Sequence, residues 1–405
     1  MSPLFTEDGA NHGDAAPGPP GNRVRSVRRT REGVIGVPAT EGNELTVLRN
    51  GDEIFPAMFE AIDGAEHTVD LLTFVYWTGD VGTTLAQKIA AAARRGVRAR
   101  VLLDAWGAHP MDRELVSLME HAGVTVNFFR PLSKMRVGGV NHRTHRKVAV
   151  VDEAVGFTGG VGIADEWQGD ARNPDEWRDT HFRVRGPAVD GLRAAFLDNW
   201  IETDPQLYDP EVDRFPDQPA AGDAVVQCVR GASETGRSDI ATSFTALLRL
   251  AEERIRITTA YFVPDPELLE QLADATGRGV RVEILVPGVH ADKRFVRLAG
   301  ERDFTALLDV GVELHYFTPT MLHAKVMTVD GLVASIGSAN FNRRSTAWDE
   351  EVNLVVIDPA TVALLDRHFD EDLERSEPVD PTRWERRPRF QRVLETAVEP
   401  LRRYS

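Results

Sequence analysis

Two copies of one short motif supply the residue types that handle phosphate. The pattern H-x-K-x4-D-x6-G-[GS] occurs twice in the chain, in register and 178 residues apart. Its residues are His145, Lys147, Asp152, Gly159 and Gly160 in the first copy, and His323, Lys325, Asp330, Gly337 and Ser338 in the second. Two histidines, two lysines and two small-residue turns brought to one point would bind a phosphate group and stabilise its charge. His145 and Lys147 lead into the buried strand 148–151, and residues two apart on a strand share a face.

Lysine is rare in this chain, so the presence of a lysine in both copies of the motif indicates a specific role for it. There are five lysines, at positions 88, 134, 147, 293 and 325, against 42 arginines. A compact ammonium serves where a planar guanidinium does not fit beside a phosphate. An exposed histidine and lysine on an edge strand would explain one copy of the motif, but two copies in register indicate a shared site.

Other chemistries fit the sequence less well. A zinc site needs three or four histidine, cysteine or carboxylate ligands. His142 and His145 are candidates, but ammonium groups beside the ligands would oppose a divalent cation. The chain contains neither a G-x4-G-K-[ST] phosphate loop nor a G-x-S-x-G turn. We therefore expect no metal and no other cofactor.

A pair of histidines can exchange groups on phosphorus without a metal. One neutral histidine attacks phosphorus, and the other, protonated, gives its proton to the leaving alkoxide. A carboxylate normally holds the second ring nitrogen of such a histidine. One candidate follows each copy: Asp179 comes 34 residues after His145, and Glu351 comes 28 residues after His323. These arguments do not decide which histidine is the nucleophile.

Composition limits the class of protein. The length of 405 residues suggests two or three domains, and the single cysteine, Cys228, excludes an intramolecular disulfide. A net charge of −16 argues against nucleic acid as a partner. No segment has the ~18 consecutive apolar residues of a membrane span. Two arginine-rich stretches, Arg23–Arg31 and Arg383–Arg403, are either solvated or in contact with an anionic membrane surface.

The order of elements repeats along the chain. Helical and strand patterns alternate from Leu45 onward and again after a proline-rich stretch at 204–222. Residues 95–103 (RGVRARVLL) reappear almost unchanged as residues 278–286 (RGVRVEILV). Such alternation predicts an α/β fold built from βαβ units on a largely parallel sheet. Tyr76, Trp77, Tyr261 and Phe262 follow strands that end near the motif, and either line a path for acyl chains or belong to the core.

With these residues in view, the chain resembles the phospholipase D superfamily over residues 45–375, and within it the bacterial cardiolipin synthases. The stretches that carry the resemblance are the two H-x-K motifs, Thr158–Glu166, Trp177–His181, Tyr261–Asp265 and Gly337–Ser345. The resemblance implies two duplicated α/β/α sandwich domains, related by a pseudo-twofold axis, with one active site at their interface. The expected divisions are a disordered or loosely ordered tail (1–44), a first domain (45–203), a linker (204–222), a second domain (223–375) and an arginine-rich extension (376–405).

The resemblance also assigns roles to individual residues. His145 would be the nucleophile and His323 the general acid and base, although the assignment could be reversed. The other roles implied are phosphate binding by Lys147, Lys325, Asn340, Gly160 and Ser338, orientation of the histidines by Asp179 and Glu351, and a structural role for Asp152 and Asp330. The first half has Gly162 where the second has Asn340, so one expected phosphate donor is missing there.

The function implied is transfer of a phosphatidyl group, through a phosphohistidine, to a lipid or alcohol hydroxyl. Hydrolysis of a phospholipid or, less readily, of nucleic acid is the alternative, and a non-catalytic lipid-binding protein is an alternative of another class. The expected substrate is a phospholipid like phosphatidylglycerol. We expect a cytoplasmic monomer that contacts the membrane peripherally, because the N-terminal spanning helices of membrane-embedded cardiolipin synthases have no counterpart here.

Overall fold

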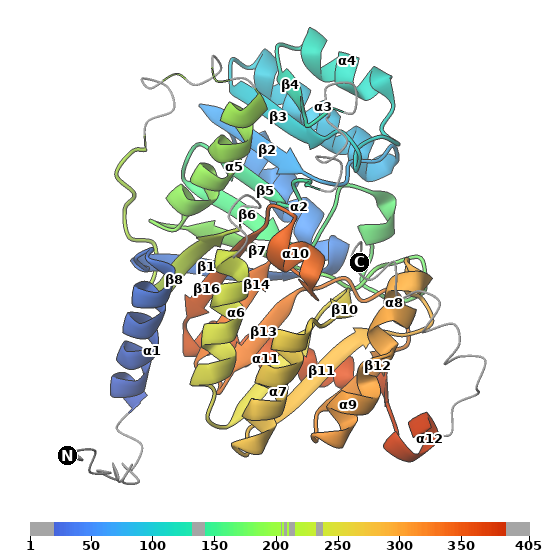
Figure 1. The fold of residues 1–405 in the computed structure, drawn as a ribbon. Helices are drawn as coiled ribbons and strands as arrows, with labels where there is room; N and C mark the ends of the chain where they lie inside the picture. Colours follow the sequence, from blue (N-terminus) through green and yellow to red (C-terminus); the bar gives the residue numbers. More distant parts are fainter. Residues whose placement is uncertain are drawn as a thin grey trace, which may run out of the picture.

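The structure is a computed structural model, and it describes residues 20–131, 142–203, 205, 209, 215–231 and 238–385. Within these residues, fifteen strands form one continuous sheet that is covered by helices on both faces (Figure 1). The strands are β1 (Thr40–Arg49), β2 (Thr68–Thr73), β3 (Arg98–Asp104), β4 (Thr125–Phe129), β5 (Val148–Val151), β6 (Val155–Gly159), β7 (Thr180–Arg185), β8 (Ala224–Arg230), β9 (Arg254–Thr258), β10 (Phe262–Val263), β11 (Arg281–Pro287), β12 (Glu313–Phe317), β13 (Val326–Val329), β14 (Val333–Gly337), β15 (Phe341–Asn342), β16 (Val352–Ile357) and β17 (Ser376–Pro378). The short strands β10 and β15 pair with each other outside the large sheet.

The helices alternate with these strands in both halves of the chain. They are α1 (Pro20–Ile35), α2 (Asn50–Asp63), α3 (Asp80–Arg94), α4 (Arg113–His121), the 3-10 helix η2 (Asp165–Trp167), α5 (Val189–Thr203), α6 (Asp239–Leu250), α7 (Pro266–Gly277), α8 (Arg294–Glu301), α9 (Phe304–Asp309), α10 (Arg343–Ala347), α11 (Pro359–Glu374) and α12 (Pro381–Glu385). Each half has its own core on one face of the sheet, under α2 to α4 or under α6, α7 and α9. A third core on the other face joins α5 of the first half to α11 of the second.

The order of strands in the sheet expresses the duplication. From the edge of the sheet inward, the first half has the order β4-β3-β2-β5-β6-β7-β1. The second half begins with the edge strand β17 and then has the matching order β12-β11-β9-β13-β14-β16-β8. The two halves meet where β1 pairs antiparallel with β8, so the sheet runs unbroken through both. The two duplicated α/β units inferred from the sequence therefore share one sheet.

The prediction of a largely parallel sheet is wrong. Only β2-β3-β4 and β9-β11-β12 pair in parallel within the large sheet, while the other neighbours in its described part pair antiparallel. The reason lies in the motif segments. Each runs into a hairpin, β5–β6 or β13–β14, whose first strand inserts antiparallel beside β2 or β9. A short turn can join only antiparallel neighbours, and alternation of strands and helices does not reveal such hairpins.

The motif aspartates tie the turns of these hairpins to the sheet. Asp152 follows β5 and accepts three successive backbone N–H groups at the start of β2, at 2.7 to 2.9 Å. Asp330 follows β13 and accepts three at the start of β9, also at 2.7 to 2.9 Å. Lys147 and Lys325 precede the strands that these aspartates follow, so lysine and aspartate lie at opposite ends of each strand. This geometry supports a structural role for both aspartates.

Residues 20–44 were predicted to be disordered or loosely ordered, and that prediction is wrong for this stretch. They form α1 and the first part of β1, which pairs with β7 and β8. Arg31 is buried and donates to the Gln227 side chain and to Ser243 Oγ, at 2.8 to 3.2 Å. Arg23 pairs with Asp330. Composition marked this stretch as polar, but Arg23 and Arg31 contact the second half of the protein, whereas Arg25 and Arg29 are exposed. Residues 1–19 lie outside the described residues.

The start of the predicted C-terminal extension belongs to the fold. β17 extends the sheet by pairing antiparallel with β12. Trp384 of α12 is buried, with its ring 5.4 Å from that of Phe304. Residues 386–405, which hold most of the arginine-rich stretch, lie outside the described residues. Among the residues described, no helix has the length and apolar character that a membrane crossing requires.

Candidate active site

The two motif segments meet at the junction of the halves, because each one pairs with a segment of the other half. The backbone N–H of His145 donates to the carbonyl of Glu350, at 2.8 Å. The backbone N–H of His323 donates to the carbonyl of Arg178, at 2.7 Å. Each contact belongs to a one-residue parallel bridge, so the two bridges are equivalent under the duplication. A backbone link of this kind fixes each histidine relative to the opposite half.

The carboxylates that hold the histidines cross between the halves. His145 Nδ1 donates to both oxygens of Glu351, at 3.0 and 3.1 Å. His323 Nδ1 donates to Asp179 Oδ2, at 2.8 Å. Sequence reasoning found both carboxylates, each downstream of one copy of the motif, but the partner of each is the histidine of the other copy. With Nδ1 bound in this way, Nε2 of each ring carries the free lone pair or the mobile proton.

Both motif lysines are buried beside their histidines. Lys147 Nζ donates to the backbone carbonyl of His145 at 2.8 Å. Lys325 Nζ donates to the carbonyl of His323 and lies 2.9 Å from its Nδ1. Arg146, between His145 and Lys147, donates instead to groups below the site such as the carbonyl of Ala195, at 2.8 Å. The alternation expected of an extended segment therefore puts each histidine and lysine on one face.

Burial and mutual repulsion shift the pKa values of these groups in a consistent direction. Burial, with the nearby ammonium groups, lowers the pKa of His145 well below its ordinary value. Burial also lowers the pKa of Lys147 to about 8 and that of Lys325 to about 7, although carboxylates nearby oppose both shifts. Burial is the largest cause of both lysine shifts, and Asp179 and Glu351 partly balance the ammonium charges. A bound phosphate would favour the charged form of both lysines, as expected of a site that takes an anion.

The two histidines differ in their electrostatic surroundings. Burial lowers the pKa of His323 to about 4, but its hydrogen bond with Asp179 works in the opposite direction. Burial works to raise the pKa of Asp179, but the hydrogen bond from His323 and nearby positive charges outweigh it and hold that pKa at about 2. Burial raises the pKa of Glu351. His323 therefore faces the more firmly ionised carboxylate and is the easier of the two to protonate.

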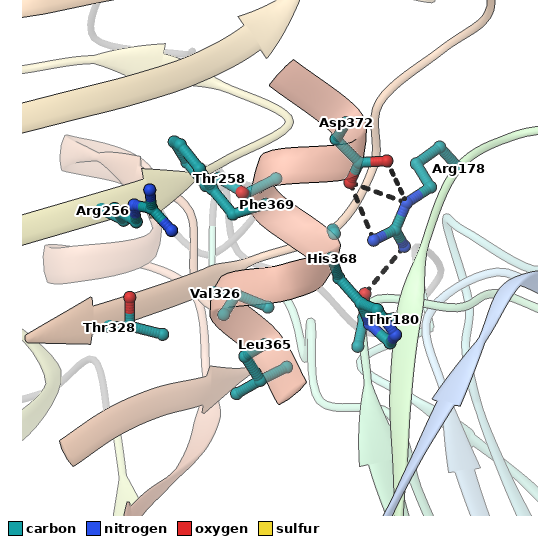
Figure 2. Close-up of a pocket in the computed structure, with 11 residues that line it drawn as sticks. Arg178, Thr180, Arg256, Thr258, Val326, Thr328, Leu365, His368, Phe369 and Asp372 are labelled. Carbon is teal, nitrogen blue, oxygen red and sulfur yellow. Dashed lines mark hydrogen bonds and ion pairs between the residues drawn. The ribbon is translucent and has the colours of Figure 1, made fainter. Parts of the chain in front are cut away.

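An ion pair across the halves joins Arg178, the residue before Asp179, to Asp372 (Figure 2). Arg178 points away from the site, toward α11, where its Nε lies 2.9 Å from Asp372 Oδ2. It also donates to Thr180 Oγ1 at 2.8 Å. The Arg178 and Asp372 side chains are almost fully buried. Loss of one partner from such a pair typically costs ~3–5 kcal/mol, because it leaves a buried charge uncompensated. This pair was not predicted from the sequence.

Phosphate binding by Gly160 and Ser338, which the resemblance implied, lacks an available donor. The backbone N–H of Gly160 already donates to Thr180 O at 3.2 Å, and that of Ser338 donates to Val352 O at 3.1 Å. The Ser338 hydroxyl donates to Glu351. At Gly160 a side chain has no room, since a Cβ would lie 2.2 Å from Asp179 Oδ1. Both positions support the carboxylates rather than the phosphate.

The absence of an asparagine at Gly162 has a steric cause. A Cβ there would lie 2.8 Å from Val75 Cβ and 3.0 Å from the ring of Trp167. Trp167 Nε1 donates to Asp179 Oδ2 at 2.9 Å, and its ring meets that of His323 edge-on at 5.1 Å. Where the second half has an asparagine, the first half therefore has a glycine, and Trp167 fills the space beside it and donates to Asp179. In the second half, Asn340 is buried and accepts the backbone N–H of Tyr261 through Oδ1, at 3.3 Å.

The aromatic residues left open by the sequence divide between core and site. Tyr76 is fully buried and donates to Gly82 O at 2.8 Å, and Phe262 is buried in the second core. The ring of Tyr261 lies 6.2 Å from that of His323 and perpendicular to it. Phe74, which sequence reasoning missed, meets His145 edge-on at 5.4 Å.

Comparisons with known proteins agree with this geometry. The family model described as "Cardiolipin synthase, PLD-like domain" matches residues 58–167 and 244–373. Cardiolipin synthase 1 of Bacillus anthracis is 31% identical over 377 residues, which span 90% of this chain and 74% of the relative. Cardiolipin synthase of Geobacillus kaustophilus is 33% identical over 366 residues, spanning 90% and 73%. The crystal structure of phosphatidylserine synthase from Haemophilus influenzae shares the fold, with a TM-score of 0.73 at 15% identity, and the match covers 94% of this chain and all of that one.

The steric account of Gly162 predicts a loss of stability. Gly162→Ala should lower the free energy of unfolding by about 1–3 kcal/mol, because the added methyl must displace Val75 or Trp167. Gly277→Ala is the matched control, since a Cβ there meets nothing within 4 Å and should leave stability unchanged or slightly raised. Urea denaturation of the three proteins measures both effects. Equal stability of the Gly162 variant and the wild type would contradict the steric account.

The lowered lysine pKa values predict how the rate depends on pH. Lys325 and Lys147 lose their charge as the pH rises through about 7 and about 8, instead of near 10 as for ordinary lysines. Because kcat/KM reports the free enzyme, it should fall across this range as phosphate binding weakens. A phosphodiester substrate keeps one negative charge throughout, so the change belongs to the protein. A kcat/KM that stays level up to pH 10 would contradict the prediction.

Proposed function

Because the chain belongs to the cardiolipin synthase family of phospholipase D-like proteins, we propose that it is a phosphatidyltransferase. It takes a phosphatidyl group from a phospholipid such as phosphatidylglycerol and passes it to the hydroxyl of a second lipid or alcohol. The crossed histidine–carboxylate pairs carry this proposal, since they bring one histidine from each half to a single site. Two histidines with two lysines are the groups needed for two successive displacements at phosphorus.

In the first step, Nε2 of His145 attacks phosphorus and the bond from phosphorus to the leaving oxygen breaks. His323 gives its Nε2 proton to that oxygen, so the first alcohol leaves neutral. In the second step, the acceptor hydroxyl attacks phosphorus, its proton passes to His323, and the bond from phosphorus to His145 breaks. Lys147 and Lys325 stabilise the non-bridging oxygens in both steps, and the Nδ2 group of Asn340 is available as a further donor.

The difference between the two histidines supports this assignment of roles. The pKa of His145 is lowered by burial and by the surrounding cations, which favours the neutral ring that a nucleophile requires. His323 is paired with an ionised Asp179, which favours the protonated ring that a general acid requires. Negative charge on a bound phosphate raises both pKa values.

Incubation of the purified protein with phosphatidylglycerol vesicles tests the function, with products identified by mass spectrometry. Cardiolipin and glycerol are expected. His145→Ala and His323→Ala should each lower turnover by ~10³-fold or more, because each removes a group that forms or breaks a bond. Activity should persist in chelator, since the lysines supply the charge that a metal would otherwise provide.

Other outcomes of this experiment would indicate a different function or mechanism. Phosphatidic acid as the main product would mean that water is the acceptor and that the protein is a phospholipase. Full turnover by both histidine variants would exclude the phosphohistidine mechanism. No change in any lipid would leave binding without catalysis as the function, and loss of turnover with chelator would indicate a metal.

We further propose that the rim of the site contacts the surface of an anionic membrane. Trp106 is 60% exposed and Val289 is 75% exposed. Both stand eight residues after equivalent positions, Arg98 and Arg281, which begin β3 and β11. The two residues are thus related by the duplication, one on each side of the site. These two exposed side chains supply the apolar part of the proposed membrane contact.

Contacts around these two residues connect them to the site. The carbonyl of Gly107, next to Trp106, accepts from Trp77 Nε1 at 2.9 Å. On the other side, Phe295 is also exposed, and Lys293 and Arg294 precede it. Apolar and basic side chains together favour an anionic lipid surface. Arg23, the first residue of the Arg23–Arg31 stretch, pairs with Asp330 at the opposite end of β13 from Lys325 and so lies away from this rim.

Vesicle binding tests this contact. The double variant Trp106→Ser, Val289→Ser should bind phosphatidylglycerol vesicles roughly tenfold more weakly in a sedimentation assay, because it loses most of the exposed apolar area. Turnover of a dissolved short-chain phosphatidylglycerol should not change. Val310→Ser is the control, since Val310 is exposed at the other end of the strands, before β12. Unchanged vesicle binding by the double variant would exclude this rim as the membrane contact.

A further inference from the structure

One wall of the site carries polar side chains that the phosphate chemistry leaves unused. Tyr261 contacts His323 and begins this wall. Its hydroxyl donates to Asp292 Oδ2 at 2.7 Å, and the other oxygen of Asp292 accepts the backbone N–H of Lys293 at 2.7 Å. Asp292 therefore fixes both the ring of Tyr261 and the residue that precedes α8. All of these residues come from the second half.

The ammonium of Lys293 is directed over this wall. It lies 5.0 Å from the centre of the Tyr261 ring, and it makes no hydrogen bond or ion pair with any residue in the described parts of the chain. Solvent can reach Lys293, yet the surrounding protein atoms lower its pKa by burial. Its charge also contributes to the lowered pKa values of His145 and Lys147, so it stands within electrostatic reach of both. An unpaired cation in this position attracts an anion beside the first phosphate.

Asp349 has an oxygen without a partner. Its side chain is buried, and Oδ2 accepts from Arg344 Nε at 2.8 Å. Oδ1 is also buried but has no hydrogen bond among the residues described. Burial raises the pKa of this carboxyl to about 7. Asp349 is two residues before Glu351, which holds His145. A buried polar atom without a partner is costly, and near an active site a ligand hydroxyl can satisfy it.

We propose that Lys293 and Asp349 form the subsite that binds the acceptor, an anionic phosphoglycerol head group. Lys293 holds the acceptor's own phosphate, and Asp349 Oδ1 forms a hydrogen bond with a hydroxyl of its glycerol. This inference rests on the proposed transferase function and deepens it. The subsite holds the acceptor hydroxyl beside the phosphohistidine during the second step, so that it attacks phosphorus ahead of water.

The two residues recognise different parts of the acceptor, which separates their effects. A phosphate-bearing acceptor needs both residues, whereas free glycerol needs only Asp349. Lys293→Ala should therefore raise the KM for a short-chain phosphatidylglycerol acceptor about tenfold, with little change in the KM for glycerol. Asp349→Asn removes the carboxylate but keeps the shape, and should impair both acceptors.

The experiment measures the ratio of transfer to hydrolysis with a dissolved short-chain phosphatidyl donor at varied acceptor concentration. Lys293→Ala is the main variant, because an exposed side chain can be removed without unfolding the protein. Lys88→Ala is the matched control, since Lys88 pairs with Asp63 on the surface. The ratio should fall about tenfold in the Lys293 variant and stay constant in the Lys88 variant. An unchanged ratio in the Lys293 variant overturns the proposal, as does an equal fall in transfer and hydrolysis.

Inhibition by soluble glycerol phosphate separates a failure of this subsite from a failure of the proposed function. If the wild type hydrolyses phosphatidylglycerol but never transfers, the transferase proposal fails. Glycerol phosphate should then still inhibit hydrolysis by the wild type, and about tenfold more weakly in the Lys293 variant. Equal inhibition of the two proteins would overturn the subsite as well.

Discussion

The crossed bonds between histidines and carboxylates are the constraint on which the site depends. His145 is held by Glu351 and His323 by Asp179, so each half supplies a reacting group and the means to orient its counterpart. Neither half has a complete site by itself. Removing one carboxylate would leave the histidine that it holds without its hydrogen bond. It would also leave the buried Lys147 and Lys325 with less opposite charge nearby. The two halves are therefore coupled in energy as well as in geometry.

The rest of the fold keeps this crossing in register. The β1–β8 pairing makes one sheet of the two halves, and α5 and α11 share a core beneath it. The Arg178–Asp372 ion pair then fastens the segment that carries Asp179 to a helix of the opposite half. Since a continuous sheet and a common core resist relative motion, the separation between the two histidines is set by the fold. A reaction that needs both at one phosphorus atom benefits from this rigidity.

The reacting groups can be predicted from the sequence alone, but the contacts that position them cannot. The duplicated spacing identified both histidines and both lysines, and the need for a carboxylate beside each histidine pointed to Asp179 and Glu351. The sequence did not reveal which carboxylate serves which histidine, because chain order places each one after its own copy. Two features, the burial of Arg31 and the Arg178–Asp372 ion pair, depend on contacts between segments that are distant in sequence. Composition does not predict such contacts. For the same reason, Gly160 and Ser338 were assigned to phosphate although their donors are already used.

The differences between the two halves give them different chemical roles. Trp167 occupies the space that Gly162 leaves open and holds Asp179, while Ser338 holds Glu351. An ionised Asp179 favours a protonated His323, and the cations around His145 favour its neutral form. The same second half also supplies Tyr261, Lys293 and Asp349 on one wall. If His323 gives its proton to the first alcohol and takes one from the second, both alcohols must approach from its side. The polar wall beside His323 is therefore where an acceptor has to be recognised.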